Sequence, residues 1–400
     1  MSAATRSAPT RHVDHLVIGG GPAGSMVALR LAAAGRQVLL LEKESLPHHK
    51  VCGEFLSHEA VSYLHQVGVA PRNLGAAVIH HLRFTAGSKL IATPLPFQAL
   101  SLSRLVLDEA LLARAEAKGC QVLRGVAVES LTPRGSDPHD GDWLATLATG
   151  ESLRASTVFL ATGKHNLRGI VRAPAKQSDL IGFKLHWQLA PTQILALREH
   201  MDLYLFPGGY GGLSLVEDDV ANLCLVVRRS TLRSRGGWPQ LLASILRGNC
   251  HLRQLLEGGT ALWPRPIAIS PIPYGYLLGQ PPRGLWCVGD QAAVIPSFTG
   301  DGISIALHSA ALATHMFLCG ASAADYNRSL RAQLTRSMAL ATWLSRAAVT
   351  GAGRRAALSV LPRLPNLLCW IAASTRIPQS SLVPDEFAPD GAGPAARQSA

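Results

Sequence analysis

Three glycines near the N-terminus have the spacing of a dinucleotide-phosphate cradle. Gly19, Gly21 and Gly24 follow the apolar run 16–18 in the pattern G-x-G-x-x-G. The first glycine of that pattern permits a tight turn, the second lets a pyrophosphate approach the backbone, and the third lets the next helix pack closely on the sheet. The sequence predicts that helix over 22–34, with its free N–H groups and its dipole directed at the phosphates.

An acid follows at the distance that nucleotide binding requires. A buried parallel strand predicted over 37–41 ends at Glu42 and Lys43, and Glu42 lies eighteen residues after Gly24. An acid at this position hydrogen-bonds ribose hydroxyls and repels a 2′-phosphate. Strand, helix and acid in register therefore predict a bound dinucleotide.

A second glycine-bearing segment, CVGDQAAVIPSFTGDGIS at 287–304, is suited to the flavin end of FAD. A strand predicted over 284–288 has an aspartate at its tip, where it can bind a ribitol hydroxyl. A glycine-bearing loop then leads into an apolar helix predicted over 301–318. Backbone N–H groups at the start of this helix can stabilise negative charge on the reduced flavin. The predicted cofactor residues of this segment are Gly289, Asp290, Pro296, Gly300, Asp301, Gly302 and Ile303. The two segments together predict an FAD-binding oxidoreductase.

These pieces resemble the superfamily of FAD proteins that contains geranylgeranyl reductases and aromatic hydroxylases, over about 13–376. The matching pieces are VIGGGPAG…LLLEK, KVCGEFLS, LSRLVLDEALLARAEAKG, VFLATGK (ending in Gly163-Lys164), LFPGGYGGL and the GD segment. KVCG and PGGY favour the geranylgeranyl-reductase side. In such relatives an arginine contacts FAD and the K-x-C-G loop passes beside the flavin ring. By this resemblance Lys50, Cys52, Gly53, Arg104 and Gly163 join the cofactor site.

Two departures from the resemblance bear on the reaction. Many relatives carry an aspartate before the glycine that matches Gly163, and this chain has Thr162. That aspartate serves FAD and the nicotinamide donor in aromatic hydroxylases, so hydroxylase-type reduction is in doubt. The reductases often place tryptophan and phenylalanine after P-x-x-Y, whereas Tyr210 is followed here by Gly-Gly-Leu. The wall of the substrate pocket is therefore altered.

The expected fold is α/β, with a Rossmann-like FAD-binding domain of the aromatic-hydroxylase and glutathione-reductase type. Into it is inserted an antiparallel sheet that forms a substrate domain, and a helical tail follows. The FAD domain is predicted to be discontinuous, over 13–75, 99–173 and 279–320, with the substrate domain over 76–98 and 174–278. A helical C-terminal region is expected over 321–382 and a disordered tail over 383–400. Alternation over 182–189 places Lys184 and His186 on the opposite face from Phe183, Leu185 and Trp187.

Composition excludes several classes of protein. The 400 residues can bury a large core. The seven cysteines are scattered singly, which argues against a zinc site or a disulfide framework and for a reducing compartment. No apolar signal segment opens the chain, and residues 1–10 are expected to be a loose arm. No metal site is expected, because the adjacent side chains of His48 and His49 diverge.

The net charge of +12 is concentrated towards the C-terminus. No acid occurs between Asp325 and Asp385, whereas eight arginines do, mixed with leucines and Trp370. One interpretation is a helix lying on an anionic membrane surface. The other, which we favour from sequence, is a helical layer packed on the FAD domain with a solvated arginine face. The arginines lack a nucleic-acid-binding motif, so no such partner is expected.

The sequence offers three candidate catalytic residues. Cys52 could donate a proton opposite hydride delivery or could be a small buried residue, and Glu54 could act as an acid or pair locally with Lys50. Tyr210 could overhang the flavin or pack on the sheet. FAD fills the one dinucleotide fingerprint, so the electron donor is NAD(P)H bound transiently or a reduced carrier protein.

The preferred function is reduction of a C=C bond in an apolar isoprenoid, quinone or polyketide-lipid substrate. The alternatives are an NAD(P)H- and O₂-dependent monooxygenase acting on an aromatic substrate, and a flavin electron-transfer partner of a membrane complex. The expected location is cytoplasmic, with peripheral contact at the inner membrane face as the alternative.

Overall fold

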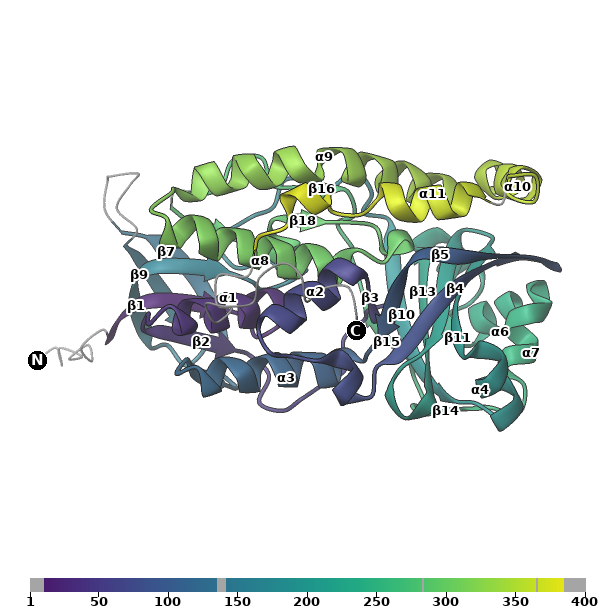
Figure 1. Cartoon of the computed structure of the whole chain (residues 1–400), viewed down its shortest axis with the longest axis horizontal. Coiled ribbons are helices and arrows are strands. Elements are labelled where there is room, and N and C mark those ends of the chain that lie inside the picture. The colour runs from purple at the N-terminus through teal and green to yellow at the C-terminus, as the bar shows by residue number, and fades with distance from the viewer. Residues whose placement is uncertain (1–10, 135–141, 283, 365, 385–400) are drawn as a thin grey trace, which may run out of the picture.

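Two β-sheets lie side by side, and the C-terminal helices run along both (Figure 1). The computed structural model describes residues 11–134, 142–282, 284–364 and 366–384. The arm expected over 1–10 and most of the tail expected over 383–400 fall outside these residues.

The first sheet has seven strands, in the order β6-β2-β1-β9-β8-β7, with β17 also paired to β9. Its parallel pairs are β1 with β2 and β9, β2 with β6, and β9 with β17; β7, β8 and β9 pair antiparallel. The bounds are β1 Arg11–Ile18, β2 Val38–Glu42, β6 Gln121–Arg124, β7 Val128–Pro133, β8 Trp143–Leu147, β9 Ser152–Leu160 and β17 Trp286–Cys287. All of β2 is buried, as parallel strands covered on both faces require.

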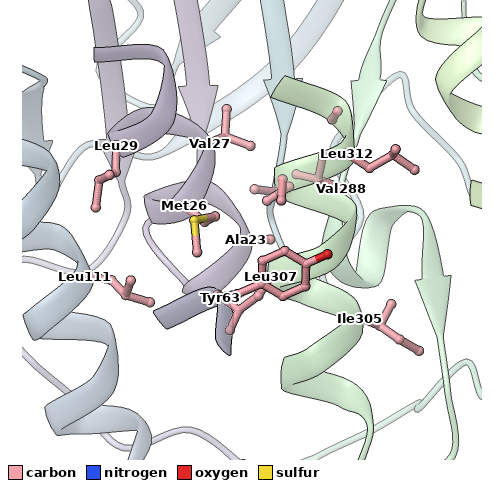
Figure 2. Close-up of a cluster of buried hydrophobic side chains, with 14 of the residues drawn as sticks. Ala23, Met26, Val27, Leu29, Tyr63, Leu111, Val288, Ile305, Leu307 and Leu312 are labelled. Carbon is pink, nitrogen blue, oxygen red and sulfur yellow. The ribbon is translucent and has the colours of Figure 1, made fainter. Parts of the chain in front are cut away.

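Three helices cover one face of the first sheet: α1 (Pro22–Ala33), α3 (Arg104–Ala117) and α8 (Gly302–Leu318). Figure 2 shows Met26 of α1 on the side of Leu111 of α3, and Tyr63 beside Leu307 of α8. Tyr63 comes from α2 (His58–Gln66), and its hydroxyl lies 2.8 Å from Nδ1 of His308. The expected helix after the glycine turn is confirmed, and α8 is an apolar helix as expected.

The second sheet has nine strands, in the order β14-β10-β13-β12-β11-β4-β5-β3, with β15 paired to β10. The bounds are β3 Phe55–Leu56, β4 Ala77–Ala86, β5 Lys89–Ser101, β10 Leu180–Gln188, β11 Glu199–Phe206, β12 Gly209–Leu215, β13 Val220–Arg228, β14 Thr260–Ala261 and β15 Ile267–Ile269. One face packs on α4 (Pro191–Leu197), α6 (Trp238–Gly248) and α7 (Cys250–Leu256). Phe183 and Trp187 of β10 face this core, as the alternation predicts.

The C-terminal region forms α9 (Ala323–Ala348), α10 (Gly351–Val360) and α11 (Asn366–Ser374). Helix α9 packs on α8 and is tied to the first sheet, since the Tyr326 hydroxyl donates to the Cys287 carbonyl over 3.0 Å. No helix of the described residues is long and apolar enough to cross a membrane. The remaining short elements are α5 Arg229–Ser234, β16 Tyr276–Leu277, β18 Ala293–Val294, and the 3₁₀ turns η1 Pro71–Leu74, η2 Glu217–Asp219, η3 Gly289–Gln291, η4 Ser297–Thr299 and η5 Gln379–Ser381.

The sequence predicts a helix over 100–119, a strand over 121–129 and a further helix that begins at residue 328, and the boundaries of all three were wrong for local reasons. The helix predicted over 100–119 begins at Arg104, because Ser103 caps it by accepting from the Val106 N–H. The strand predicted over 121–129 is divided into β6 and β7 at Gly125, which has φ +73°. The helix predicted from residue 328 begins at Ala323, because Ser322 and Asp325 form a capping box.

A buried ionic cluster holds the centre of the second sheet. Asp202 of β11 is fully buried and pairs with Arg83 of β4, with 2.5 Å between Oδ1 and Nε. The Tyr204 hydroxyl and Nε2 of His251 also lie within hydrogen-bond distance of Oδ2, at 2.9 and 2.8 Å. The Asp202 carboxylate therefore joins β4, β11 and α7.

Replacing Asp202 by Ala should lower the free energy of unfolding by about 3–5 kcal/mol, because Arg83 would remain buried without its counter-charge. Tyr204→Phe removes one hydrogen bond and should cost only about 1 kcal/mol. Chemical unfolding followed by circular dichroism measures both. Equal losses in the two variants would contradict the assignment.

Candidate active site

The glycine turn between β1 and α1 excludes side chains on its inner side. Gly19 has φ +108°, and a Cβ there would lie 2.5 Å from the Ala161 carbonyl oxygen. A Cβ at Gly24 would overlap the Gly19 carbonyl. A Cβ at Gly21 would meet only Arg104, with 3.3 Å to a guanidinium nitrogen. The turn thus packs tightly against β9 and leaves the backbone at Gly21 open beside a cation, which fits a bound pyrophosphate.

Glu42 lies at the end of β2 beside this turn. Its carboxylate accepts from the backbone N–H of Gly20 over 2.6 Å and from that of Glu44 over 3.0 Å. A small pocket adjoins it, lined among others by Gly20, Glu42, Asp108 and Arg124. Lys43 points to solvent and pairs with Glu44. Glu42 is therefore fixed beside the glycine turn, and its contact with an adenosine ribose stays a prediction.

Asp108 joins the two cations that the resemblance placed beside the cofactor. Arg104, the first residue of α3, donates to it from Nε and Nη2 over 2.7 and 2.9 Å, and Nζ of Lys50 lies 3.0 Å away. Burial alone would raise the pKa of Asp108. The positive charges of Arg104 and Lys50 lower it by more than burial raises it, so the pKa lies below its usual value. Asp108 was missed in the sequence because it reads as an ordinary polar residue of a helix.

The tip of β17 is tied to the tip of β9. Asp290 pairs with Lys164 over 2.8 Å, and the side-chain amide of Gln291 donates to the Thr162 hydroxyl over 2.7 Å and to the Gly163 carbonyl over 2.9 Å. Thr162, which replaces the aspartate of many relatives, thus serves as an acceptor for Gln291. The glycine turn, Gly163 and Asp290 therefore lie along one edge of the first sheet.

The loop from Pro296 to Ile303 is shaped by close packing. Gly300 has φ +76°, and a Cβ there would lie 2.8 Å from Phe55. The Asp301 side chain makes no capping hydrogen bond to α8; it is buried and pairs with Arg376, with 2.8 Å between Oδ1 and Nη1. Burial raises the pKa of Asp301 to about 6. Arg376 therefore belongs to the loop and not to a solvated arginine face.

The segment KVCGEF crosses from the first sheet to the second. The Cys52 thiol accepts from the Glu54 N–H over 3.3 Å, interacts with Arg104, and is half-buried. The Cys52 carbonyl accepts from the Asn222 side chain of β13 over 3.1 Å. Cys52 therefore lies between the Arg104 guanidinium, which is beside Gly21, and strand β13 of the second sheet.

Glu54 is fully buried and has φ +60°, a strained conformation for a glutamate. Its Oε1 accepts from the Arg104 N–H over 2.7 Å and from Nζ of the buried Lys184, and its Oε2 lies 3.1 Å from Nε2 of His186. The local pairing with Lys50 considered above is wrong, because Lys50 binds Asp108. Burial alone would raise the pKa of Glu54. The contacts with His186 and Lys184 lower it by more than burial raises it, so the pKa lies below its usual value.

His49 lies at the outer side of this cluster. Its ring centroid is 4.8 Å from those of both His186 and Trp263. Burial, Lys184 and His186 lower the pKa of His49 to about 4. Ligand atoms of His49, Glu54 and His186 lie within 4.8 Å of one another, but the Lys184 ammonium already occupies Oε1 of Glu54. A cation could bind there only by displacing Lys184.

Tyr210 is buried on β12 and reaches the loop before α8. Its hydroxyl lies 3.3 Å from that of Ser345 and 3.4 Å from that of Ser297, and its ring packs edge-on against Phe298. Burial raises the pKa of Tyr210. The tyrosine therefore packs on the sheet, and its role above a flavin or substrate stays a prediction.

Glu54→Gln should lower the free energy of unfolding by about 3–5 kcal/mol, because Lys184 would be left buried without a counter-charge. Adding Lys184→Met should recover much of that loss. Since the pKa of Glu54 is lowered, its contribution is present at neutral pH and is lost as the pH falls below the ordinary glutamate value of 4.5. Unfolding of the two single variants and the double variant at several pH values tests this; strictly additive losses would refute the coupling.

Gly24→Ala and Asp290→Ala should each weaken the retention of FAD. The first drives a methyl group into the Gly19 carbonyl, and the second removes the predicted ribitol acceptor. Flavin absorbance per protein after gel filtration measures the effect. Asp179→Ala, an exposed aspartate outside the site, is the control, and full flavin occupancy in Asp290→Ala would overturn that part of the site.

Comparison with known proteins agrees with this geometry. Residues 12–166 match the family described as FAD binding domain. The menaquinone reductase of Mycolicibacterium smegmatis is 25% identical over 328 residues, 78% of each chain. Digeranylgeranylglycerophospholipid reductase 1 of Methanopyrus kandleri is 28% identical over 311 residues, 74% of this chain and 77% of that protein.

A solved structure shares the fold over nearly the whole chain. The geranylgeranyl bacteriochlorophyll reductase-like protein of Thermoplasma acidophilum has a TM-score of 0.71 at 19% identity and covers 93% of this chain and 95% of its own. The glycine turn, Glu42 and the cation at Gly21 fit FAD, and the expected architecture is confirmed. Residues 12–166 therefore form an FAD-binding domain, and the chain is an FAD-dependent oxidoreductase that is similar to the reductases named above.

Proposed function

We propose that the protein reduces a C=C bond of an apolar isoprenoid or quinone substrate. The observation that carries this proposal is the likeness, over about three quarters of the chain, to reductases named for menaquinone and for a digeranylgeranyl lipid. Both named molecules carry long isoprenoid chains. A likeness of that extent cannot be confined to the FAD-binding domain at residues 12–166.

FAD, when bound and reduced, supplies a hydride, and the protein must supply a proton to the other carbon of the double bond. Glu54 is poorly suited to that step, because Lys184, His186 and the N-terminus of α3 hold its carboxylate ionised. We assign proton donation to the Cys52 thiol, which is half-buried and lies beside Arg104. Glu54 then positions Arg104 and the Cys52 loop.

The electron donor is proposed to be NAD(P)H, which is typical of this superfamily, bound transiently. The one glycine fingerprint is filled by FAD, so a second dinucleotide requires another part of the protein. Anaerobic mixing with NADPH and with NADH tests this by bleaching of the flavin absorbance. Bleaching by neither nucleotide would assign the donor role to a reduced carrier protein.

The reaction is tested by incubating the FAD-loaded, reduced protein anaerobically with menaquinone and with a geranylgeranyl lipid, followed by mass spectrometry. A product that has gained two hydrogen atoms is the expected result. A product that has gained an oxygen atom, formed only when O₂ is admitted and an aromatic substrate is present, would replace this proposal with the monooxygenase.

Cys52→Ala should lower the rate of product formation by about 10²–10⁴-fold while FAD is retained, because general acid catalysis contributes that much. Cys319→Ala, which removes an exposed thiol, is the matched control and should leave the rate unchanged. A Cys52→Ala variant of full activity would exclude the thiol as the proton donor.

A further inference from the structure

The last three helices expose large apolar side chains to solvent. Trp343 of α9 is 66% exposed, Leu364 in the turn after α10 is 56% exposed and Trp370 of α11 is 57% exposed. Val360 at the end of α10 is 40% exposed. Figure 1 shows these helices together along one side of the molecule, with α10 at its end. We call Trp343, Arg346, Arg355, Val360, Arg363, Leu364 and Trp370 the C-terminal surface.

Arginines are interspersed with these apolar residues, and neither α10 nor α11 contains an acid. Arg346, Arg355 and Arg363 are exposed, and within the part of the chain that the structure describes none of them has a carboxylate within ion-pair distance. No aspartate or glutamate occurs between Asp325 and Asp385 in the sequence. The charge of this surface is therefore uncompensated, unlike that of Arg376, which neutralises Asp301.

Helix α10 contributes little to the core. None of its residues is fully buried, and the turn that follows exposes Pro362, Arg363 and Leu364. A short helix of arginines and aliphatic residues, next to exposed tryptophans, has the composition that lies at the boundary between lipid headgroups and acyl chains. Tryptophan and arginine both suit that boundary, because each has an apolar body and a polar end.

We propose that the C-terminal surface docks on an anionic lipid bilayer. A second copy of the chain is a poor occupant, since a two-fold contact would place this acid-free arginine cluster against itself. Tryptophan and arginine are also common at protein interfaces, so the absence of acids, and not the composition alone, separates the two occupants. An anionic membrane satisfies both features, because its headgroups neutralise the arginines and its interface accepts the indoles. This inference does not depend on the proposed function.

The charge contribution is tested with the full-length, FAD-loaded protein and vesicles of phosphatidylcholine with and without phosphatidylglycerol. Co-sedimentation should require phosphatidylglycerol and weaken with added salt. Arg355→Gln with Arg363→Gln should lower the partition coefficient by about 25-fold, at about fivefold for each arginine near an anionic surface. The control is Arg233→Gln with Arg235→Gln, two exposed arginines at the C-terminal end of α5; it removes equal charge elsewhere and should have little effect.

The apolar contribution is tested by Leu364→Ser with Trp370→Ser, which should lower binding several-fold at high salt, where arginine contributes least. Leu195→Ser on α4, where the leucine is 65% exposed, is the matched control. Flavin content and circular dichroism of each variant show that the fold is retained. Neither Leu364 nor Trp370 is among the residues assigned to the cofactor site, so these variants should keep their FAD.

Three outcomes would overturn the proposal. Equal loss of binding in the control with Arg233→Gln and Arg235→Gln would show that membrane binding depends only on the net charge of +12. Binding to pure phosphatidylcholine at the same strength would exclude recognition of anionic lipid. Sedimentation equilibrium that shows a dimer, abolished by Leu364→Ser with Trp370→Ser, would assign the surface to a second copy of the chain.

Discussion

One buried carboxylate joins the two sheets at the candidate site. Glu54 is placed at the end of the KVCG loop, where it accepts from the first turn of α3 and from Lys184 and His186 of β10. Helix α3 belongs to the domain expected to bind the nucleotide, whereas Lys184 and His186 belong to the second sheet. The strained backbone at Glu54 persists because these partners fix the side chain in one position. Glu54 thereby fixes the Cys52 loop and the first turn of α3, whereas Asp108 orients the Arg104 guanidinium.

The architecture was predictable because its elements are encoded locally. The glycine spacing, the acid at Glu42 and the apolar run of β2 each require a particular backbone or burial, so they indicate the nucleotide fold directly. The alternation along β10 likewise separated Lys184 and His186 from the helix-covered face. The bounds of short strands such as β17 were harder to predict, because two paired residues are too few to show an alternation of apolar and polar side chains.

The ionic partners of the site could not be predicted, because they join residues far apart in the chain. Glu54 and Lys184 are 130 residues apart, and Asp301 and Arg376 are 75 apart. Such pairs are set by how the sheets and helices pack, and a single sequence carries no signal for that. The one available indication for Glu54 was Lys184 itself, a lysine within a strand of otherwise buried character.

The position of Arg376 has a consequence for how the two ends of the molecule communicate. Arg376 follows α11 by two residues, donates to the Thr299 carbonyl and pairs with Asp301 at the start of α8. A shift of α11 would withdraw a positive charge from a buried carboxylate in the loop expected to face the flavin. The outer helices and the loop expected to face the flavin are therefore joined through one guanidinium.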